Sequence, residues 1–262
     1  MLLSINDLHG YPIHATDGEI GTVDEFYFDT ETWTIRYLVV DTGNWLPGRR
    51  VLISPISISG IDQTTKTFSA RLTKEQVKNS PDIDTHKPVS RQHEMEYFNY
   101  FASPYYWYGG GLWGAGFYPG ALTTAAALGA VSAAEPPPAA DKADSHLRST
   151  KVVLHYHIAA LDGEIGHGNN FIMDDETWAI RYLVVDPKNW WPGKHVLVSP
   201  RWIERVSWEE SKVFVDLSRE MIKRSPEYTP ESLDREYETE LHQHYSRRGY
   251  WVDEPIGAKP LN

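Results

Sequence analysis

Hydrophobic and polar residues alternate over several short stretches in the first 80 residues, a pattern that predicts β-strands. Residues 19–28 alternate in this way. The strongest predicted strand is residues 33–41, WTIRYLVVD, which is rich in β-branched and aromatic residues and is apolar on both faces in its second half. Further short strands are predicted at residues 51–54, 56–61 and 68–72. Five or six short strands within about 65 residues are typical of a small closed β-barrel.

The same pattern occurs twice. Residues 17–55 and residues 162–200 align without a gap at a constant offset of 145 residues, and 25 of the 39 aligned positions are identical. Such self-similarity predicts two copies of one fold.

Each predicted barrel is followed by helical signals. Thr73 and Gln76 form a capping box, and the helix that they begin ends before Pro81. The second copy keeps only half of this box, because Ser218 is followed three residues later by Met221. A second helix is predicted at residues 91–101 and 235–245. In the later copy its apolar stripe recurs every fourth residue, at Leu233, Tyr237, Leu241 and Tyr245.

The stretch between the copies has an unusual composition. There is no charged residue between Glu96 and Glu135, and its first half is crowded with aromatic residues and glycine, whereas its second half is rich in alanine. Three interpretations remain open: aromatic side chains that fold back on the barrels, a docking site for a partner, or a membrane contact. The expected organisation is repeat 1 with its helices at 1–101, an aromatic, Gly-, Ala- and Pro-rich linker at 102–147, repeat 2 with its helices at 148–250, and a tail at 251–262.

Composition narrows the function classes. The 262 residues carry a net charge of −11 with a pI near 5.4, which argues against nucleic acid as the main partner. The chain contains no cysteine, which excludes thiol chemistry, disulfides and Cys-ligated zinc. The first residues show neither a basic region nor a long apolar run. We therefore expect no signal peptide and a cytoplasmic location.

The order of motifs resembles the PRC-barrel family. Both copies contain DGEIG, a strand, RYLVVD and a loop with Trp, Pro and Gly, followed by VLISP in the first copy and VLVSP in the second. The resemblance covers about residues 5–80 and 150–226. It implies a mainly β protein of two small antiparallel PRC-type β-barrels, each followed by short helices. The family includes the cytoplasmic part of the photosynthetic reaction centre H subunit. The resemblance implies docking onto larger protein assemblies and no shared catalytic set.

Two groups of residues invite a chemical interpretation. Asp17 with Glu19, repeated as Asp162 with Glu164, offers paired carboxylates, but the Asp-Gly dipeptide is already explained by a tight turn. A metal site at His155 and His157 is the second possibility. The first copy has no equivalent, since proline stands at the position of His157. The sequence therefore predicts no enzyme, no cofactor and no metal.

Candidate interaction residues are the large apolar side chains of the loops and the linker. They are Trp45, Leu46, Pro47, Trp190, Trp191, Pro192, Tyr105, Tyr106, Trp107 and Trp113. The loop tryptophans either cover the barrel end or form a contact surface.

The function predicted from sequence is a non-catalytic protein–protein interaction or scaffolding module. Its barrels are expected to pair within the chain or as a homodimer, with an unidentified protein as partner. Two alternatives stay open: an assembly factor associated with a membrane or a photosynthetic complex, and a metal-binding protein or enzyme that uses His155 and His157.

Overall fold

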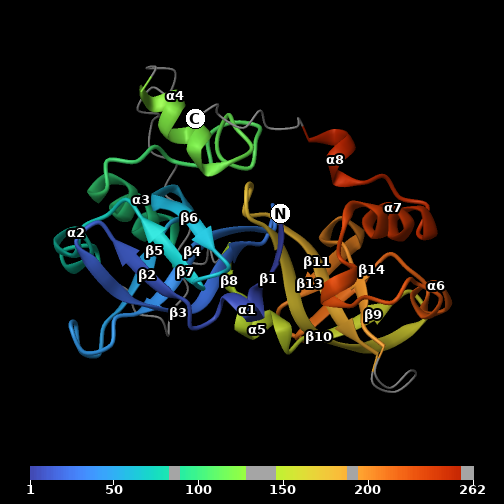
Figure 1. Cartoon of the computed structure of the whole chain (residues 1–262). Helices are drawn as coiled ribbons and strands as arrows, with labels where there is room; N and C mark the ends of the chain where they lie inside the picture. Colours follow the sequence, from blue (N-terminus) through green and yellow to red (C-terminus); the bar gives the residue numbers. More distant parts are fainter. Residues whose placement is uncertain (83–88, 128–145, 188–193, 255–262) are drawn as a thin grey trace. The chain divides into compact units, whose positions relative to one another are not determined.

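The computed structural model describes residues 1–82, 89–127, 146–187 and 194–254 (Figure 1). The chain divides into two compact units. Unit 1 contains Met1, Asp7–Thr150 and Asp175–Ala179, and unit 2 contains Leu2–Asn6, Lys151–Asp174 and Ile180–Asn262. The fold is mainly β, with one curled sheet and several short helices in each unit, as the sequence predicts.

The sheet of unit 1 is built from consecutive short strands. Its order is β5-β4-β3-β2-β7-β6, and β2 pairs with β7 in parallel, whereas the other pairs in this path are antiparallel. The strands are β2 (Pro12–Ala15), β3 (Gly18–Asp29), β4 (Thr34–Asp41), β5 (Arg50–Ile53), β6 (Ile58–Asp62) and β7 (Thr67–Ala70).

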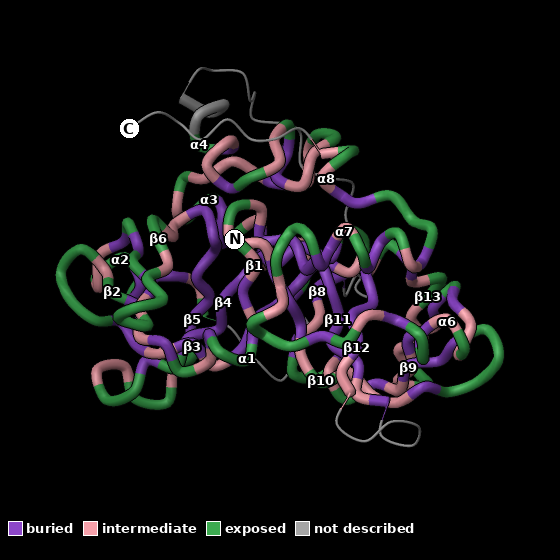
Figure 2. Tube along the Cα trace, turned by 45° about the vertical axis from the view of Figure 1, so that its right-hand side comes forward, coloured by how far each residue is buried: buried purple, intermediate pink, exposed green. Residues whose placement is uncertain are grey.

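The sheet of unit 2 repeats this order as β12-β11-β10-β9-β14-β13, with β14 and β9 as the parallel pair. Its strands are β9 (His157–Ala160), β10 (Gly163–Asp174), β11 (Ile180–Asp186), β12 (Val196–Val198), β13 (Ile203–Ser207) and β14 (Lys212–Val215). The central strands of both sheets are buried along most of their length (Figure 2). This agrees with the two-sided apolar pattern of RYLVVD.

Each sheet is extended by a strand that lies before the other repeat in sequence. β1 (Leu2–Ser4) pairs with β10 of unit 2, with Leu3 opposite Met173. β8 (Leu147–Ser149) pairs with β3 of unit 1, with Arg148 opposite Phe28. The contact-defined units therefore do not coincide with the sequence repeats, because each sheet takes up a strand that precedes the other repeat. The short helices α1 (Ile5–Leu8) and α5 (Thr150–Leu154) follow these two strands.

The helices after each barrel occur where the sequence predicts them. α2 (Lys74–Lys78) begins with the complete capping box of Thr73 and Gln76, and α6 (Arg219–Lys223) keeps only the Ser218 side-chain cap. α3 (Arg91–Tyr100) and α7 (Arg235–His244) are the second helices. The remaining helices are α4 (Pro119–Ala127), α8 (Tyr250–Asp253) and the 3-10 turns η1 (Pro55–Ser57), η2 (Pro200–Trp202) and η3 (Pro230–Ser232). Within the described ranges, no helix is both long and apolar enough to cross a membrane.

The glycine that ends DGEIG allows a close approach of two strands. Gly21 has a φ of +139°, and a Cβ placed on it would lie 2.1 Å from the carbonyl oxygen of Asp41. Gly166 repeats this contact with the carbonyl oxygen of Asp186, also at 2.1 Å. An alanine at either position therefore requires movement of the neighbouring backbone as well as an unfavourable φ.

We expect Gly21→Ala to lower the free energy of unfolding by about 2 kcal/mol or more, because the clash is with backbone and not with a mobile side chain. Gly60→Ala is the matched control, since nothing lies within 4 Å of a Cβ at that position. Urea unfolding of both variants measures the difference. If Gly21→Ala and Gly60→Ala lower the free energy of unfolding equally, the contact with the Asp41 carbonyl does not require glycine at position 21.

Candidate functional site

The aspartates of the paired carboxylates suggested by the sequence bind the backbone at the start of a helix. The side chain of Asp17 accepts a hydrogen bond from the backbone N–H of Lys74 at 2.8 Å, and Asp162 accepts one from the backbone N–H of Arg219 at 2.7 Å. Each aspartate thus satisfies a donor in the first turn of the following helix. Glu164 forms a surface ion pair with Lys212 at 3.0 Å, which lowers the pKa of its carboxyl.

The Trp loop of the first repeat is tied to the barrel through Trp45. The indole N–H of Trp45 donates to the carbonyl of Ile20 at 2.8 Å, and the Lys74 ammonium lies 4.6 Å from the centre of the Trp45 ring. Leu46 is half-buried and Pro47 is exposed. The corresponding residues Trp190, Trp191 and Pro192 lie outside the described residues.

The aromatic linker packs into unit 1 over its described part. Tyr106 and Trp113 are buried, and the Trp113 indole donates to the carbonyl of Thr177 at 2.8 Å. Tyr105 and Trp107 are half-buried and stack on one another, with 4.6 Å between ring centres. Of the three interpretations of this stretch, folding back onto the barrel describes these side chains.

Tyr106 completes a buried carboxylate cluster that sequence reasoning did not identify. Glu94 on α3 has no exposed surface. Its Oε1 accepts hydrogen bonds from the hydroxyls of Tyr37 at 2.9 Å and Tyr106 at 2.8 Å. Its Oε2 lies 3.0 Å from the guanidinium of Arg91 and 2.7 Å from Nε2 of His146. The cluster joins the barrel, the helix and the linker through one carboxylate.

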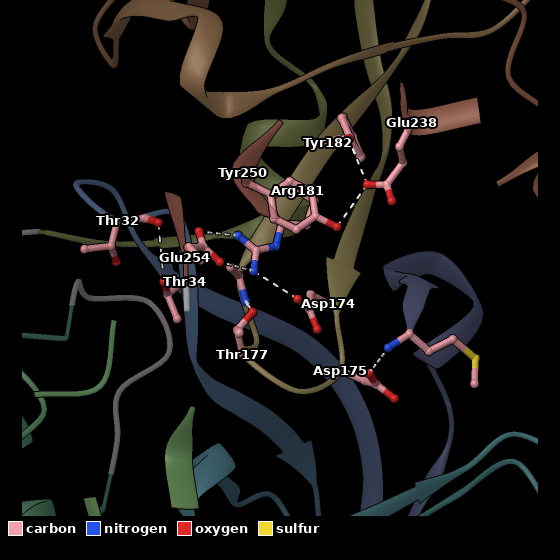
Figure 3. A network of polar contacts seen from close by, with 12 residues as sticks. Thr32, Thr34, Asp174, Asp175, Thr177, Arg181, Tyr182, Glu238, Tyr250 and Glu254 are labelled. Carbon is pink, nitrogen blue, oxygen red and sulfur yellow. Dashed lines mark hydrogen bonds and ion pairs between the residues drawn. The ribbon is translucent and has the colours of Figure 1, made fainter. Parts of the chain in front are cut away.

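Unit 2 contains an equivalent cluster around Glu238 (Figure 3). The hydroxyls of Tyr182 and Tyr250 both donate to its Oε1 at 2.9 Å, and Arg235 pairs with its Oε2 at 3.0 Å. Burial raises the pKa of Glu238 above its ordinary value, although the two tyrosines and Arg235 act in the opposite direction. Burial also raises the pKa of Tyr182.

The signal for these clusters was present in the sequence. Arg91, Glu94, Tyr106 and Trp107 align with Arg235, Glu238, Tyr250 and Trp251 at a single offset of 144 residues. The repeat therefore continues into the linker and into the C-terminal tail, both of which were expected to lie outside it. Low-complexity composition concealed the match in the linker.

Arg36 of unit 1 and the equivalent Arg181 of unit 2 have different carboxylate partners. In unit 1, Arg36 is buried between the rings of Tyr106 and Trp113 and donates to the carbonyl of Leu112 at 2.6 Å. Its carboxylate partner, Asp29, is 3.7 Å away, and burial lowers the pKa of the guanidinium. In unit 2, Arg181 pairs with two carboxylates, which offset the effect of burial and raise its pKa.

The histidines proposed for a metal do not form a pair with each other. His155 is exposed, whereas His157 faces His167 across β9 and β10, with 4.2 Å between ring centres. In the part of the chain that the structure describes, no group of three or more His, Cys, Asp or Glu residues is arranged to hold a metal ion.

Comparison with known proteins identifies the first barrel. The family model of the PRC-barrel domain matches residues 2–77. The first repeat is thus similar to PRC-barrel domains. An uncharacterised protein of Deinococcus radiodurans is 37% identical over 84 residues, which cover 32% of this chain and 30% of that protein. The similarity thus spans less than a third of the relative. The PRC-barrel match ends within α2, so Glu94, Tyr106 and His146 lie beyond the residues that the family model covers, whereas Tyr37 lies within them.

Proposed function

We propose that this chain is a non-catalytic protein–protein interaction module made of two PRC-type barrels, the second being the unit that contains β9–β14. The observation that carries the proposal is the duplicated cluster of Glu94 and Glu238. In each unit a buried carboxylate, two tyrosines and an arginine hold a helix and an aromatic segment against the barrel. Buried hydrogen-bonded networks of this kind favour one rigid arrangement, which suits a docking platform.

The other ionisable residues support the same proposal. Asp17 and Asp162 cap helices, which accounts for them without acid–base chemistry. PRC-barrel domains are in general not catalytic, and we extend this property to the whole chain. We also place the chain in the cytoplasm. In unit 1 the proposed contact residues are Trp45, Leu46 and Pro47 together with the half-buried Tyr105 and Trp107. In unit 2 they are the corresponding loop residues Trp190, Trp191 and Pro192. Tyr106 and Trp113 support this surface from inside.

Affinity co-purification from the native host tests the proposal. The intact chain is compared with a Leu46→Ser, Pro47→Ser variant, which changes the Trp loop and leaves Trp45 in place. A control variant, Val152→Ser, changes an apolar residue that is 51% exposed elsewhere. We expect a stoichiometric partner whose recovery falls at least about tenfold with the loop variant alone. A partner retained by every variant would exclude this loop, and the absence of any partner would exclude the interaction module.

A further inference from the structure

The segment Gly249–Glu254 of unit 2, here called the C-terminal latch, is held by arginines. Both terminal nitrogens of Arg181 bind the carboxylate of Glu254, at 2.8 and 2.7 Å. Arg201 contacts Asp253 at 3.1 Å and Glu254 at 3.0 Å. Bidentate arginine–carboxylate contacts of this kind select planar anionic groups by geometry as well as by charge. The latch therefore ends in an acidic pair that is recognised specifically.

Aromatic contacts hold the other half of the latch, and Figure 3 shows the contact of Tyr250 with Arg181. The Arg181 guanidinium lies 3.9 Å from the centre of the Tyr250 ring, and Arg235 lies 4.3 Å from the centre of the Trp251 ring. The Tyr250 hydroxyl also donates to Glu238 at 2.9 Å. Arg181, Arg201, Arg235 and Glu238 thus form a receptor for two consecutive aromatic residues followed, after one residue, by two carboxylates.

Unit 1 shows which of these features belong to unit 2 alone. Its equivalents of Tyr250 and Trp251 make the same stacking contacts, with Arg36 over Tyr106 and Arg91 over Trp107. At an offset of 144 residues, however, the acidic pair is replaced by Gly109 and Gly110. At an offset of 145 residues, Arg201 is replaced by Ile56. Unit 2 therefore contains both the acidic pair and Arg201, which contacts it, whereas unit 1 has neither at the equivalent positions.

The latch is short and partly exposed. α8 is four residues long, Val252 is 55% exposed, and the side chain of Arg201 is 41% exposed. The ion pairs of Arg201 are therefore partly exposed and screened by salt, whereas the Arg181–Glu254 pair is largely buried. A competing segment with the same chemistry can therefore replace the latch when its concentration approaches the effective concentration of the tethered segment.

We propose that the receptor binds, in trans, an acidic aromatic segment of a partner protein with the pattern aromatic-aromatic-x-acidic-acidic, and that the latch occupies this site in its absence. This inference rests on the proposed function, since it names the chemistry of one partner of the interaction module.

Peptide binding to the full chain tests the inference. The probe is a fluorescent peptide of sequence GYWVDEP, and the matched probe is GYWVNQP, in which the two carboxylates are amides. The protein is either wild type or a Trp251→Ala, Glu254→Gln variant, which weakens the latch without changing the receptor. We expect the variant to bind GYWVDEP at least about tenfold more tightly than wild type does, and to bind GYWVNQP about thirtyfold less tightly than GYWVDEP. Adding Arg201→Ile, the residue of unit 1, should reduce this discrimination.

A second measurement does not depend on the variants. Saturating GYWVDEP added to the wild-type chain should accelerate hydrogen exchange at residues 250–254, because the latch is displaced. Equal affinity for the two peptides, or unchanged exchange in the latch, would overturn the inference. If the chain dimerises when the latch is weakened, the inference is overturned, because the latch is then exchanged between two copies of this chain. A partner that co-purifies while the peptides fail would leave the proposed function standing and remove only this site.

Discussion

Glu94→Gln should lower the free energy of unfolding of unit 1 by about 3 kcal/mol, whereas Glu238→Gln should change that of unit 2 by no more than about 1 kcal/mol. In unit 1 the carboxylate is fully buried and faces both Arg91 and His146. An amide at this position preserves the shape but turns a donor toward two other donors and leaves the Arg91 charge without its partner. Breaking a buried ion pair on one side is costly for this reason.

The expected loss in unit 2 is smaller because its cluster is organised differently. Arg235 is 55% exposed, so water can solvate its charge when the carboxylate is removed. Burial already raises the pKa of Glu238, which means that the charged form is disfavoured there. A glutamine can still accept the hydrogen bonds of Tyr182 and Tyr250. Urea unfolding followed by hydrogen exchange on peptides from α3 and α7 assigns each loss to its unit. Equal losses in the two units would contradict this account of the difference.

Unit 2 should lose stability in acid through His242. The ring is buried against Trp202 and Trp251, and it hydrogen-bonds to the Tyr182 hydroxyl at 3.0 Å. Burial lowers the pKa of His242 from 6.5 to about 4. Between these values the unfolded chain binds a proton that the folded chain does not, so the free energy of unfolding falls as the pH decreases from 6.5 to about 4. The full effect is about 3 kcal/mol, and the contribution is constant above about pH 7.

His242→Phe should remove this pH dependence. Phe98 occupies the equivalent position of unit 1, so the substitution places a side chain there that the fold already accommodates. Glu238 acts in the opposite direction over part of the range, because an acid with a raised pKa stabilises the fold as the pH falls. The difference between the two proteins therefore isolates the histidine. The measurement is urea unfolding between pH 7.5 and 4.5, and parallel curves for wild type and His242→Phe would contradict the assignment.

Features set by local sequence were predictable. The strand at residues 33–41 follows from a two-sided apolar run, and the helix after Thr73 follows from a capping box, because both depend on neighbouring residues. The match of residues 2–77 to the PRC-barrel family model likewise agrees with motifs of fixed spacing.

Features that depend on distant partners were not predictable in the same way. Nothing in the composition of Leu2–Ser4 indicates that it pairs with β10, because a three-residue strand carries no register information of its own. Glu94 and Tyr106 are ordinary helix and linker residues until the fold brings them to Tyr37. Comparing the linker with the C-terminal tail would have revealed the Tyr-Trp pairs, since these recur at the offset of the preceding helix.

The pairing of β1 with β10 and of β8 with β3 also orders events during synthesis. The sheet of unit 1 cannot be completed until Leu147–Ser149 has left the ribosome, and Leu2–Ser4 must wait for β10 before it can pair. Such long-range pairings delay folding because a large loop must close first. A nascent chain that stops after the first barrel therefore exposes one unpaired strand and one open sheet edge. An open sheet edge of this kind can pair with a strand of another chain.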